Sequence, residues 1–246
     1  MKLWIAFVGF MSGMGLIAGF LLLSLLFSGT AAADADDPFE SVNRPIFELN
    51  QQADRFVLRP VARAYEDYTP EPIKTGMGNV LLNFSELGST VNFTLQGRFM
   101  TALRSGGRFA INSTVGFFGI LDVAGAFGLD RRSTSLAQTL DTWGLEEGPY
   151  VVLPLFGPST LRNGVAFGVE ALVLSVPAQI GTDVAVISGF GGAVDTRAEL
   201  LAFDQLVTGD EYVFYREAYL QQSVGVSASH AIDDFASSDA WDGAFE

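Results

Sequence analysis

Apolar residues recur at helical spacing along most of the chain, and sustained alternation with a period of two is absent. An amphipathic helix follows Pro45, where one helical face carries Ile46, Leu49, Ala53 and Phe56. Charged and amide side chains occupy another face of the same helix. The pattern predicts a mainly α protein with a single helical domain over residues 34–222.

Proline and acidic residues indicate where the first helices begin. Asp37, Pro38 and Glu40 have the order of an N-cap, a first helical residue and a capping-box acid. Pro45 lies deep enough in the following pattern to kink or restart the helix. Pro60 is placed to open the next one.

Two aspartates predict helix starts near the other end of the chain. Asp195 can cap one helix and Asp210 can cap another. The second helix aligns three tyrosines on one face, at Tyr212, Tyr215 and Tyr219. Such a stripe is typical of core packing. A lipid-interface belt is the alternative, because Tyr favours that depth in a membrane.

The segment from Gly148 to Arg162 breaks the helical pattern. Pro149, Pro154 and Pro158 each fix φ and remove an amide donor, so a continuous helix is excluded here. The residues between these prolines are mostly apolar. We expect a stiff, extended connector between two helical regions.

Two further stretches are apolar all round. Residues 115–129 contain one charge, Asp122, and residues 165–180 contain one charge, Glu170. Both fall short of the about 20 apolar residues that cross a bilayer, because a helix rises only about 1.5 Å per residue. Each can form a core helix, a shallow helix that enters a membrane from one side or lies along it, or an irregular apolar loop.

The two ends of the chain differ from the part between them. A lone Lys precedes a long apolar run that ends in an alanine-rich segment, so residues 1–33 are typical of a signal peptide cleaved before Asp34. Cleavage before Asp36 is an alternative, and an uncut run could remain as a membrane anchor. Residues 223–246, rich in Ser, Ala and Asp, are predicted to be a poorly ordered tail.

Composition adds constraints on partners and chemistry. The chain has 14 Lys and Arg against 28 Asp and Glu, a formal charge of −14 at pH 7, which argues against nucleic acid or an anionic lipid surface as an electrostatic partner. Charged residues make up 17% of the chain, below the roughly 25% of soluble domains. The chain contains no Cys, which excludes disulfides, thiolate metal sites and Cys nucleophiles.

Groups suited to catalysis are scarce. His230 is the single histidine and falls in the tail, so a Ser-His-Asp triad is not expected. Phosphate-loop, dinucleotide and nucleophile-elbow motifs are missing. Adjacent acids such as Glu146 and Glu147 are typical of a solvated surface. We therefore expect no enzyme activity, no cofactor and no metal site.

Asp122 is the residue whose sequence context most strongly requires a specific role, because a carboxylate among apolar side chains is costly to bury. It can cap a helix or pair with an arginine, and the arginines nearest in sequence are Arg108, Arg131 and Arg132. The alternative is that it lines a polar passage through the protein.

Several blocks of the sequence together resemble the MlaA/VacJ family of bacterial outer-membrane proteins. In chain order they include Asp37–Glu40 with Asn43 and Arg44, Leu58–Ala62, Leu95–Gly97, Arg108–Gly116, Asp122–Ala124, Gln138–Leu140, Gly148–Arg162 and Asp195–Ala198. The resemblance covers roughly residues 37–222.

The resemblance implies a ring-like helical body embedded in the inner leaflet of a Gram-negative outer membrane and enclosing an amphipathic channel. Phospholipid misplaced in the outer leaflet would pass through this channel to a soluble periplasmic lipid carrier similar to MlaC, which keeps the membrane asymmetric. Family members associate with trimeric outer-membrane porins. Their activity is transport, without a cofactor.

Residues for these roles are assigned as hypotheses. Mixed polar and apolar surroundings favour a place on the lipid path for Asn112, Asp122, Thr139, Gly148 and Tyr150. The residues expected to face the membrane are Phe117, Phe118, Ile120, Leu121 and Val123. Gly125 and Gly128 could let a gating loop hinge, and simple turn formation is the alternative.

The chain departs from the family pattern in ways that bear on attachment and local detail. Many members are lipoproteins anchored through an N-terminal Cys, so attachment here must come from the body, the porin or an uncleaved leader. Asp141 stands where Gly is common, and Asn163 where an acid is common. Two other functions stay open. One is a periplasmic scaffold that uses the apolar surfaces for protein contacts, and the other is a phospholipid hydrolase that relies on carboxylates.

Overall fold

The structure is a computed structural model that describes residues 37–171 and 182–223. The chain divides into two units, Met1–Ala202 and Phe203–Glu246, and each is described by itself. The described parts are mostly helical, which confirms the predicted fold class. The predictions for the signal peptide, for His230 and for nearly all of the tail fall outside the described residues.

The first unit begins with a long helical arm over residues 40–68 and continues through a helical hairpin over residues 71–114. In chain order its elements are α2 (Glu40–Ala53), the π-helix η1 (Asp54–Leu58), α3 (Arg59–Tyr68), α4 (Glu71–Leu95), α5 (Phe99–Thr114), α6 (Val123–Ala126), α7 (Leu136–Thr142), β1 (Tyr150–Leu153), β2 (Gly157–Thr160), α8 (Leu161–Val169) and α10 (Thr182–Leu200). The 3-10 helix η3 (Leu201–Leu206) follows, and residues 211–223 form a helix in the second unit.

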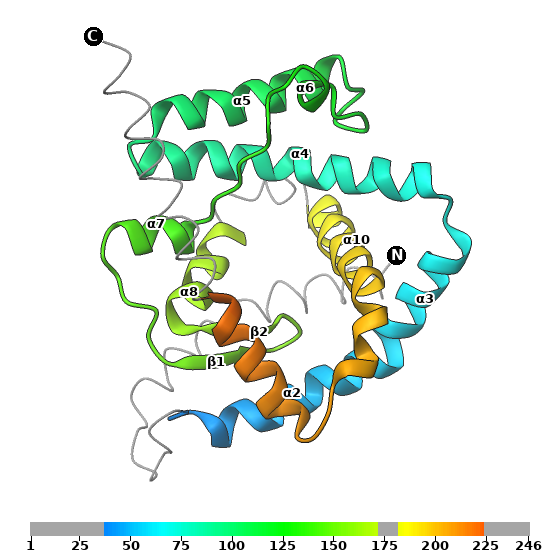
Figure 1. The fold of residues 1–246 in the computed structure, drawn as a ribbon, viewed down its shortest axis with the longest axis vertical. Coiled ribbons are helices and arrows are strands. Elements are labelled where there is room, and N and C mark those ends of the chain that lie inside the picture. The colour runs from blue at the N-terminus through cyan, green and yellow to red at the C-terminus, as the bar shows by residue number, and fades with distance from the viewer. Residues whose placement is uncertain (1–36, 172–181, 224–246) are drawn as a thin grey trace. The chain divides into compact units, whose positions relative to one another are not determined.

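Elements of the first unit contact one another in a closed circuit (Figure 1). α4 packs along α5 and also contacts α7, α7 contacts α8, and α8 contacts both strands. β1 lies against α2, which continues through η1 into α3, and α10 closes the circuit by contacting α3 and α4. This order of neighbours is that of a ring, as the family resemblance implies.

α2 does not bury the face that its apolar pattern predicts. Leu49 and Phe56, both on the predicted apolar face, are exposed, and the residues that α2 buries are Asn43 and Phe47. The predicted amphipathic helix is therefore confirmed, although its pattern did not indicate which side would be buried. The periodicity is real, but its apolar side faces outward.

The start of α2 also differs from the prediction. The helix begins at Glu40, and Phe39 stands at the N-cap position without a side-chain cap. The Asp37 carboxylate instead accepts hydrogen bonds from the Phe39 amide at 3.3 Å and from Asn43 Nδ2 at 3.2 Å. α2 runs on through Pro45 rather than restarting there, at the cost of one backbone hydrogen bond. Pro60 lies in the first turn of α3, as predicted.

Of the alternatives for residues 115–129, the structure shows the mostly irregular apolar loop rather than a helix. α5 ends at Thr114, a series of turns follows, and α6 is only four residues long. Phe117 and Phe118 have φ angles of 52° and 60°, in the left-handed region, and Gly119 follows at 92°. Three successive residues with positive φ cannot continue a right-handed helix.

The proline-rich segment is extended, as predicted, and it folds into a two-stranded antiparallel hairpin. Val152 stands opposite Pro158 in the register of β1 and β2. Pro158 has no amide to donate, and the Val152 amide bonds away from the strand pair, to Asn43 Oδ1 at 2.9 Å. The proline therefore interrupts no hydrogen bond of the ladder.

The two predicted caps near the end of the chain have different outcomes. Asp195 lies inside α10 rather than at its start, so that prediction is wrong. In the second unit, Asp210 Oδ1 accepts from the amides of Tyr212 at 2.9 Å and Val213 at 3.4 Å, which confirms the second cap. Tyr212 is buried, whereas Tyr215 and Tyr219 are half-buried. In the described part of the chain, no helix combines the length and the apolar character that a bilayer crossing needs.

Candidate functional site

Burial in the first unit is partly inverted relative to a soluble globule, beside an apolar core that includes Phe47, Phe93 and Tyr150–Leu153. Large apolar side chains are exposed along α4, α5 and the turns after α5, at Leu82, Val91, Leu95, Phe99, Met100, Leu103, Phe117, Phe118 and Phe127. Polar and charged side chains are buried between the elements, at Asn43, Asn83, Glu86, Ser89, Asn92, Ser105, Arg108, Asn112, Thr139 and Arg162. An apolar exterior of this extent indicates a lipid or protein environment rather than water.

α4 organises the buried polar groups along its length. We call this row the polar spine. Asn83, Glu86, Ser89 and Asn92 are its buried members, and half-buried Asn79 and the C-cap residue Gln96 extend it at the two ends. The spacing of three or four residues puts them on one helical face. Each donates or accepts a side-chain hydrogen bond with a segment outside α4, from the turns after α5 at one end to α7 at the other.

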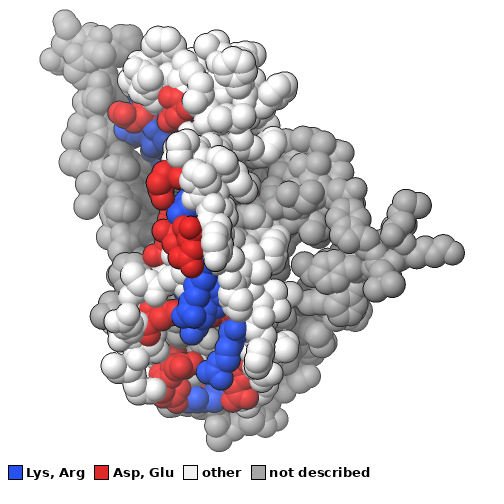
Figure 2. Space-filling model, turned by 90° about the vertical axis from the view of Figure 1, so that its right-hand side faces the viewer, with Lys and Arg blue, Asp and Glu red and all other residues white. Residues whose placement is uncertain are grey.

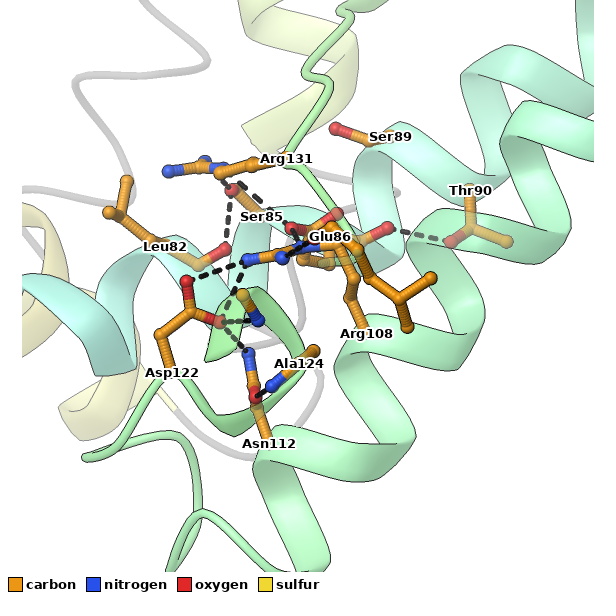
Figure 3. A network of polar contacts seen from close by, with 12 residues as sticks. Leu82, Ser85, Glu86, Ser89, Thr90, Arg108, Asn112, Asp122, Ala124 and Arg131 are labelled. Atoms are coloured by element: carbon orange, nitrogen blue, oxygen red, sulfur yellow. Dashed lines mark hydrogen bonds and ion pairs between the residues drawn. The ribbon is translucent and has the colours of Figure 1, made fainter. Parts of the chain in front are cut away.

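An ionic network lies where the spine meets α5 and α6 (Figure 3). Arg108, 3% exposed, donates from Nε to Glu86 Oε1 at 2.7 Å, and Glu86 is 1% exposed. Its Nη2 donates to both carboxylate oxygens of Asp122, at 3.0 and 3.1 Å. Arg108 Nη1 also donates to the carbonyl of Leu129. Arg131 Nε lies 3.7 Å from Glu86 Oε1, so two acids and two bases balance one another here.

Asp122 combines the two structural roles expected for it. It is the N-cap of α6, accepting from the Gly125 amide at 3.0 Å, and it pairs with Arg108. Asn112 supports the pair by donating to Asp122 Oδ1 at 2.9 Å while its own Oδ1 accepts from the Ala124 amide at 2.9 Å. Capping and pairing are thus confirmed, and a place on a polar passage stays a prediction.

The charges in this network set each other's pKa values. Burial alone raises the pKa of Asp122, and hydrogen bonds from Asn112, the Gly125 amide and Arg108 outweigh it, so the pKa lies below its usual value. Burial likewise acts to lower the pKa of Arg108, and Glu86 and Asp122 raise it above the usual value. Burial lowers the pKa of Arg131. The pKa shifts of Arg108 and Asp122 both favour the charged forms of these side chains.

The predicted hinge glycines have local structural roles. A Cβ at Gly125 would lie 2.5 Å from Asp122 Oδ2, so the capping carboxylate requires glycine at this position. Gly128 has a φ of 79° just after α6, which is typical of a turn. Hinge motion at either position stays a prediction.

A second polar cluster joins the spine to α7 and α8. Thr139 is fully buried, donates to Asn92 Oδ1 at 2.9 Å and accepts from Gln96 Nε2 at 2.9 Å. Glu170 accepts from Asn92 Nδ2 at 2.8 Å and from the Leu136 amide at 2.6 Å. Glu170, the one charge in the predicted apolar stretch, therefore ties α8 to α4 and α7.

Arg162 anchors the entry to the hairpin. It is paired with Asp141 and with Glu147, and it donates to the carbonyl of Leu145 at 2.7 Å. Gly148 follows Glu147 in the chain, just before β1, and has a φ of 71°. Asp141 thus supplies a partner for an arginine that is almost fully buried.

Two asparagines of α2 hold the outer edge of β1. Asn43 donates to the carbonyl of Tyr150 at 3.2 Å and accepts from the Val152 amide at 2.9 Å. Asn50, two turns later, donates to the carbonyl of Leu153 at 2.9 Å and accepts from the Leu155 amide at 2.7 Å. Each side-chain amide therefore pairs with the strand as a neighbouring strand would.

The structure separates the five residues predicted for a lipid path into three places. Asn112 and Asp122 belong to the ionic network, Thr139 to the cluster at α7, and Gly148 and Tyr150 to the start of the hairpin. The residues predicted to face a membrane are exposed, except that Val123 is half-buried, and Phe117 and Phe118 are 68% and 82% exposed.

Sequence reasoning missed the polar spine and with it Glu86, the partner of Arg108. The available signal was the recurrence of Asn, Glu, Ser and Gln every three or four residues within a helix that is otherwise largely apolar. Such a row is ordinarily interpreted as the solvated face. Here the same row is the buried face.

The chain is similar to known proteins over most of its length. Residues 35–224 match the model of a family described as MlaA lipoprotein. Over 213 residues the chain is 34% identical to the intermembrane phospholipid transport system lipoprotein MlaA of Shigella flexneri and to that of Escherichia coli (strain K12), covering 82% of this chain and 82% of each relative. A solved structure described as "Structural basis for maintenance of bacterial outer membrane lipid asymmetry" matches with 34% identity and a TM-score of 0.67, covering 76% of this chain and 96% of that chain.

Proposed function

Because this chain belongs to the MlaA lipoprotein family, we propose that it transports phospholipid within a bacterial envelope and so maintains the lipid asymmetry of the outer membrane. Phospholipid misplaced in the outer leaflet enters an amphipathic channel in the protein and passes to a soluble periplasmic lipid carrier. The process is transport: no bond is made or broken, and no cofactor is used.

The inversion of burial is the observation that supports this proposal best. A body with apolar side chains outside and paired polar side chains inside is suited to sit among acyl chains, because the ions it contains are already neutralised by one another. A phospholipid needs the same pair of environments, polar for its headgroup and apolar for its tails. A closed circuit of elements around buried polar groups offers both.

The proposed division of residues follows this arrangement. Polar groups of the path come from Asn112, Asp122, Thr139, Gly148 and Tyr150, together with the polar spine. The lipid-facing exterior comes from Phe117, Phe118, Ile120, Leu121 and Val123 and the exposed apolar side chains of α4 and α5. Loop motion at Gly125 and Gly128 would gate entry.

The proposed location is the periplasmic leaflet of the outer membrane, after export through the N-terminal segment. A trimeric porin is the proposed neighbour in that membrane, and a carrier similar to MlaC is the proposed acceptor. Because the chain contains no Cys for lipid modification, its apolar surfaces, the porin or a retained leader hold it in place.

The absence of Cys also makes the polarity testable residue by residue. Single-Cys variants at exposed Leu103 and Phe118 and at buried Ser89 and Ser105 would be labelled with a fluorophore after reconstitution. Phospholipids brominated on the acyl chains should quench the labels at Leu103 and Phe118. They should leave Ser89 and Ser105 unquenched, because these positions are buried inside the protein. Asp67→Cys, on the charged arm, should be quenched by aqueous iodide instead.

Transport itself requires a second measurement. The purified protein should carry phospholipid and should move labelled phospholipid from vesicles to the soluble carrier. A protein that is released from membranes by high salt and carries no lipid would favour the scaffold. Release of fatty acid in a purified assay, abolished by one carboxylate substitution, would favour a hydrolase.

A further inference from the structure

Two arginines on the helical arm of the first unit have no partner in the described part of the chain. Arg55 in η1 and Arg63 in α3 are exposed, and neither guanidinium forms a hydrogen bond or ion pair there. Arg59, between them at a spacing of four residues, donates from Nε to Asp54 Oδ2 at 3.2 Å. The three arginines share one side of the arm, and the outer two present free guanidinium groups.

The same arm exposes an apolar row next to the arginines. Phe56, Val57, Val61 and Tyr68 are all exposed, and Tyr68 is 84% exposed. α3 buries only Ala62. Water solvates the cationic side chains but not the apolar ones, and a helix that exposes both is typical of the interface of a membrane.

The acidic residues near this arm do not cancel the two arginines. Glu66 and Glu71 are held by Lys74 Nζ, at 2.7 and 3.1 Å. Asp67 is exposed and lies one turn beyond Arg63 without pairing with it. On the face seen in Figure 2, Lys, Arg, Asp and Glu gather in a narrow line, and the described surface beside that line carries no charge. A band of charge at an uncharged border matches the boundary between headgroups and acyl chains.

We propose that η1 and α3 form a headgroup ledge, in which Arg55 and Arg63 each bind the phosphate of a phospholipid while Phe56, Val57, Val61 and Tyr68 enter the acyl layer. This proposal rests on the proposed function and names the groups that hold the body at its depth. A guanidinium can donate two parallel hydrogen bonds to a phosphate, so it is suited to this role. The overall negative charge does not oppose such binding, because the ledge presents locally free cations.

An acidic protein surface would satisfy the arginines but not the adjacent apolar row. Water would satisfy the arginines and leave Phe56 and Tyr68 exposed. A phospholipid leaflet satisfies both rows at once, because phosphate lies directly above hydrocarbon. The ledge is therefore assigned to lipid.

The test compares two vesicle types that differ in phosphate. Full-length protein is mixed with vesicles of phosphatidylethanolamine and phosphatidylglycerol, or with vesicles of a digalactosyl diacylglycerol that has the same acyl chains. The variant Arg55→Gln/Arg63→Gln should lose about thirtyfold in partitioning to the phospholipid vesicles, since each arginine near such a surface contributes about fivefold to sixfold. Its partitioning to the glycolipid vesicles should stay within about twofold of the parent protein.

Controls separate this effect from net charge and from free phosphate. Arg132→Gln removes an exposed arginine outside the arm and should change partitioning little. Arg55→Lys/Arg63→Lys keeps the charge and should restore only part of the binding. Inorganic phosphate at constant ionic strength should not displace the protein. Its displacement of the protein would show that the arginines bind free phosphate, and would overturn the assignment to headgroups.

Equal losses on both vesicle types, or no loss on phospholipid, would also overturn the ledge. Lipid content distinguishes this failure from failure of the proposed function. A parent protein that copurifies with phospholipid and transfers it, alongside a double variant that partitions normally, contradicts only the ledge. A parent protein that carries no phospholipid contradicts the transport proposal itself.

Discussion

α3 and α4 follow one another in the chain and place their charges on opposite sides. α3 exposes Arg63, Glu66 and Asp67 and buries a single alanine. α4 exposes Leu82, Val91 and Leu95 and buries Asn83, Glu86, Ser89 and Asn92. Both helices are amphipathic, so the difference lies in which side meets the rest of the protein.

The comparison teaches that periodicity gives a helix two faces without saying which solvent each one meets. α3 is arranged for an environment in which charge outside is favourable. The exterior of α4 is arranged for hydrocarbon, with its polar groups satisfied by α5, α6 and α7. A chain that changes from one arrangement to the other within a few residues is suited to a boundary between water and lipid.

Removal of one buried charge tests the difference between the two helices with the largest expected effect. Glu86→Leu should lower the free energy of unfolding by about 3–5 kcal/mol, because it leaves Arg108 buried with less compensation. Glu86→Leu/Arg108→Leu should recover much of that loss, since Asp122 and Arg131 remain as opposite charges. Denaturant unfolding in detergent, read as a double-mutant cycle, measures the coupling.

The control is an ion pair on the arm. Arg44→Ala breaks the pair with Glu40, in which both side chains are 38% exposed, and should cost only about 0.5 kcal/mol. Equal losses for Glu86→Leu and Arg44→Ala would contradict the distinction between inner and outer charges.

The inner face of the arm provides a smaller effect. Asn43→Ala leaves the Val152 amide and the Tyr150 carbonyl of a buried strand without their partner, and should cost about 2 kcal/mol. Hydrogen exchange at the Val152 amide should accelerate. Gln52→Ala, at an exposed position of the same helix, should leave that amide protected. Faster exchange in both variants would argue against protection by the Asn43 hydrogen bonds.

Acid should weaken the contact of α5 with the segment that Asp122 caps. Asp122 has a folded pKa below its unfolded value, so its contribution to stability is complete above about pH 4 and is lost as the pH falls through the folded pKa. Asp122→Asn should be less stable at neutral pH and should show a flatter decline below pH 4. Unfolding free energies between neutral and strongly acidic pH measure this, and parallel curves for both proteins would exclude Asp122 as the source.

The smallest effect concerns the junction of α3 with α10. Tyr65 donates to Asp195 Oδ1 at 3.0 Å, and burial together with this hydrogen bond raises the pKa of Tyr65 to about 12. A raised folded pKa stabilises the protein below the unfolded value near 10, and that contribution is lost as the pH rises towards 12. Near-ultraviolet titration should show one late tyrosinate that Tyr65→Phe removes. An unchanged late phase would assign it to another tyrosine.

The helices and their interruptions were predictable because their causes are local. Prolines, the cap at Asp210 and the helical spacing act within a few residues, and the extended character of Gly148–Arg162 follows from its prolines. The pairing of Asp122 with Arg108 was also predictable from proximity and the cost of an isolated carboxylate. The family resemblance, confirmed by the match over residues 35–224, gave the ring-like order of elements.

The direction of burial was not predictable from local pattern. Leu49 and Phe56 have the spacing of a core face and are exposed. Asn43 has a polar side chain, which is typical of the surface, and is buried. Glu86 and Arg108 lie 22 residues apart, and only the packing of α4 on α5 brings them together. Aspartate is common at helix N-caps, but Asp195 lies inside α10, where it accepts a hydrogen bond from Tyr65.

The pairing of Asn43 and Asn50 with β1 has a consequence for aggregation where chains meet at high concentration. A two-stranded hairpin leaves backbone donors and acceptors along its outer edges, and such edges recruit strands from other molecules. Here the two side-chain amides occupy that edge of β1 with the hydrogen bonds a third strand would make. A helix thereby terminates a sheet, and the hairpin is protected from growing into an aggregate along this edge.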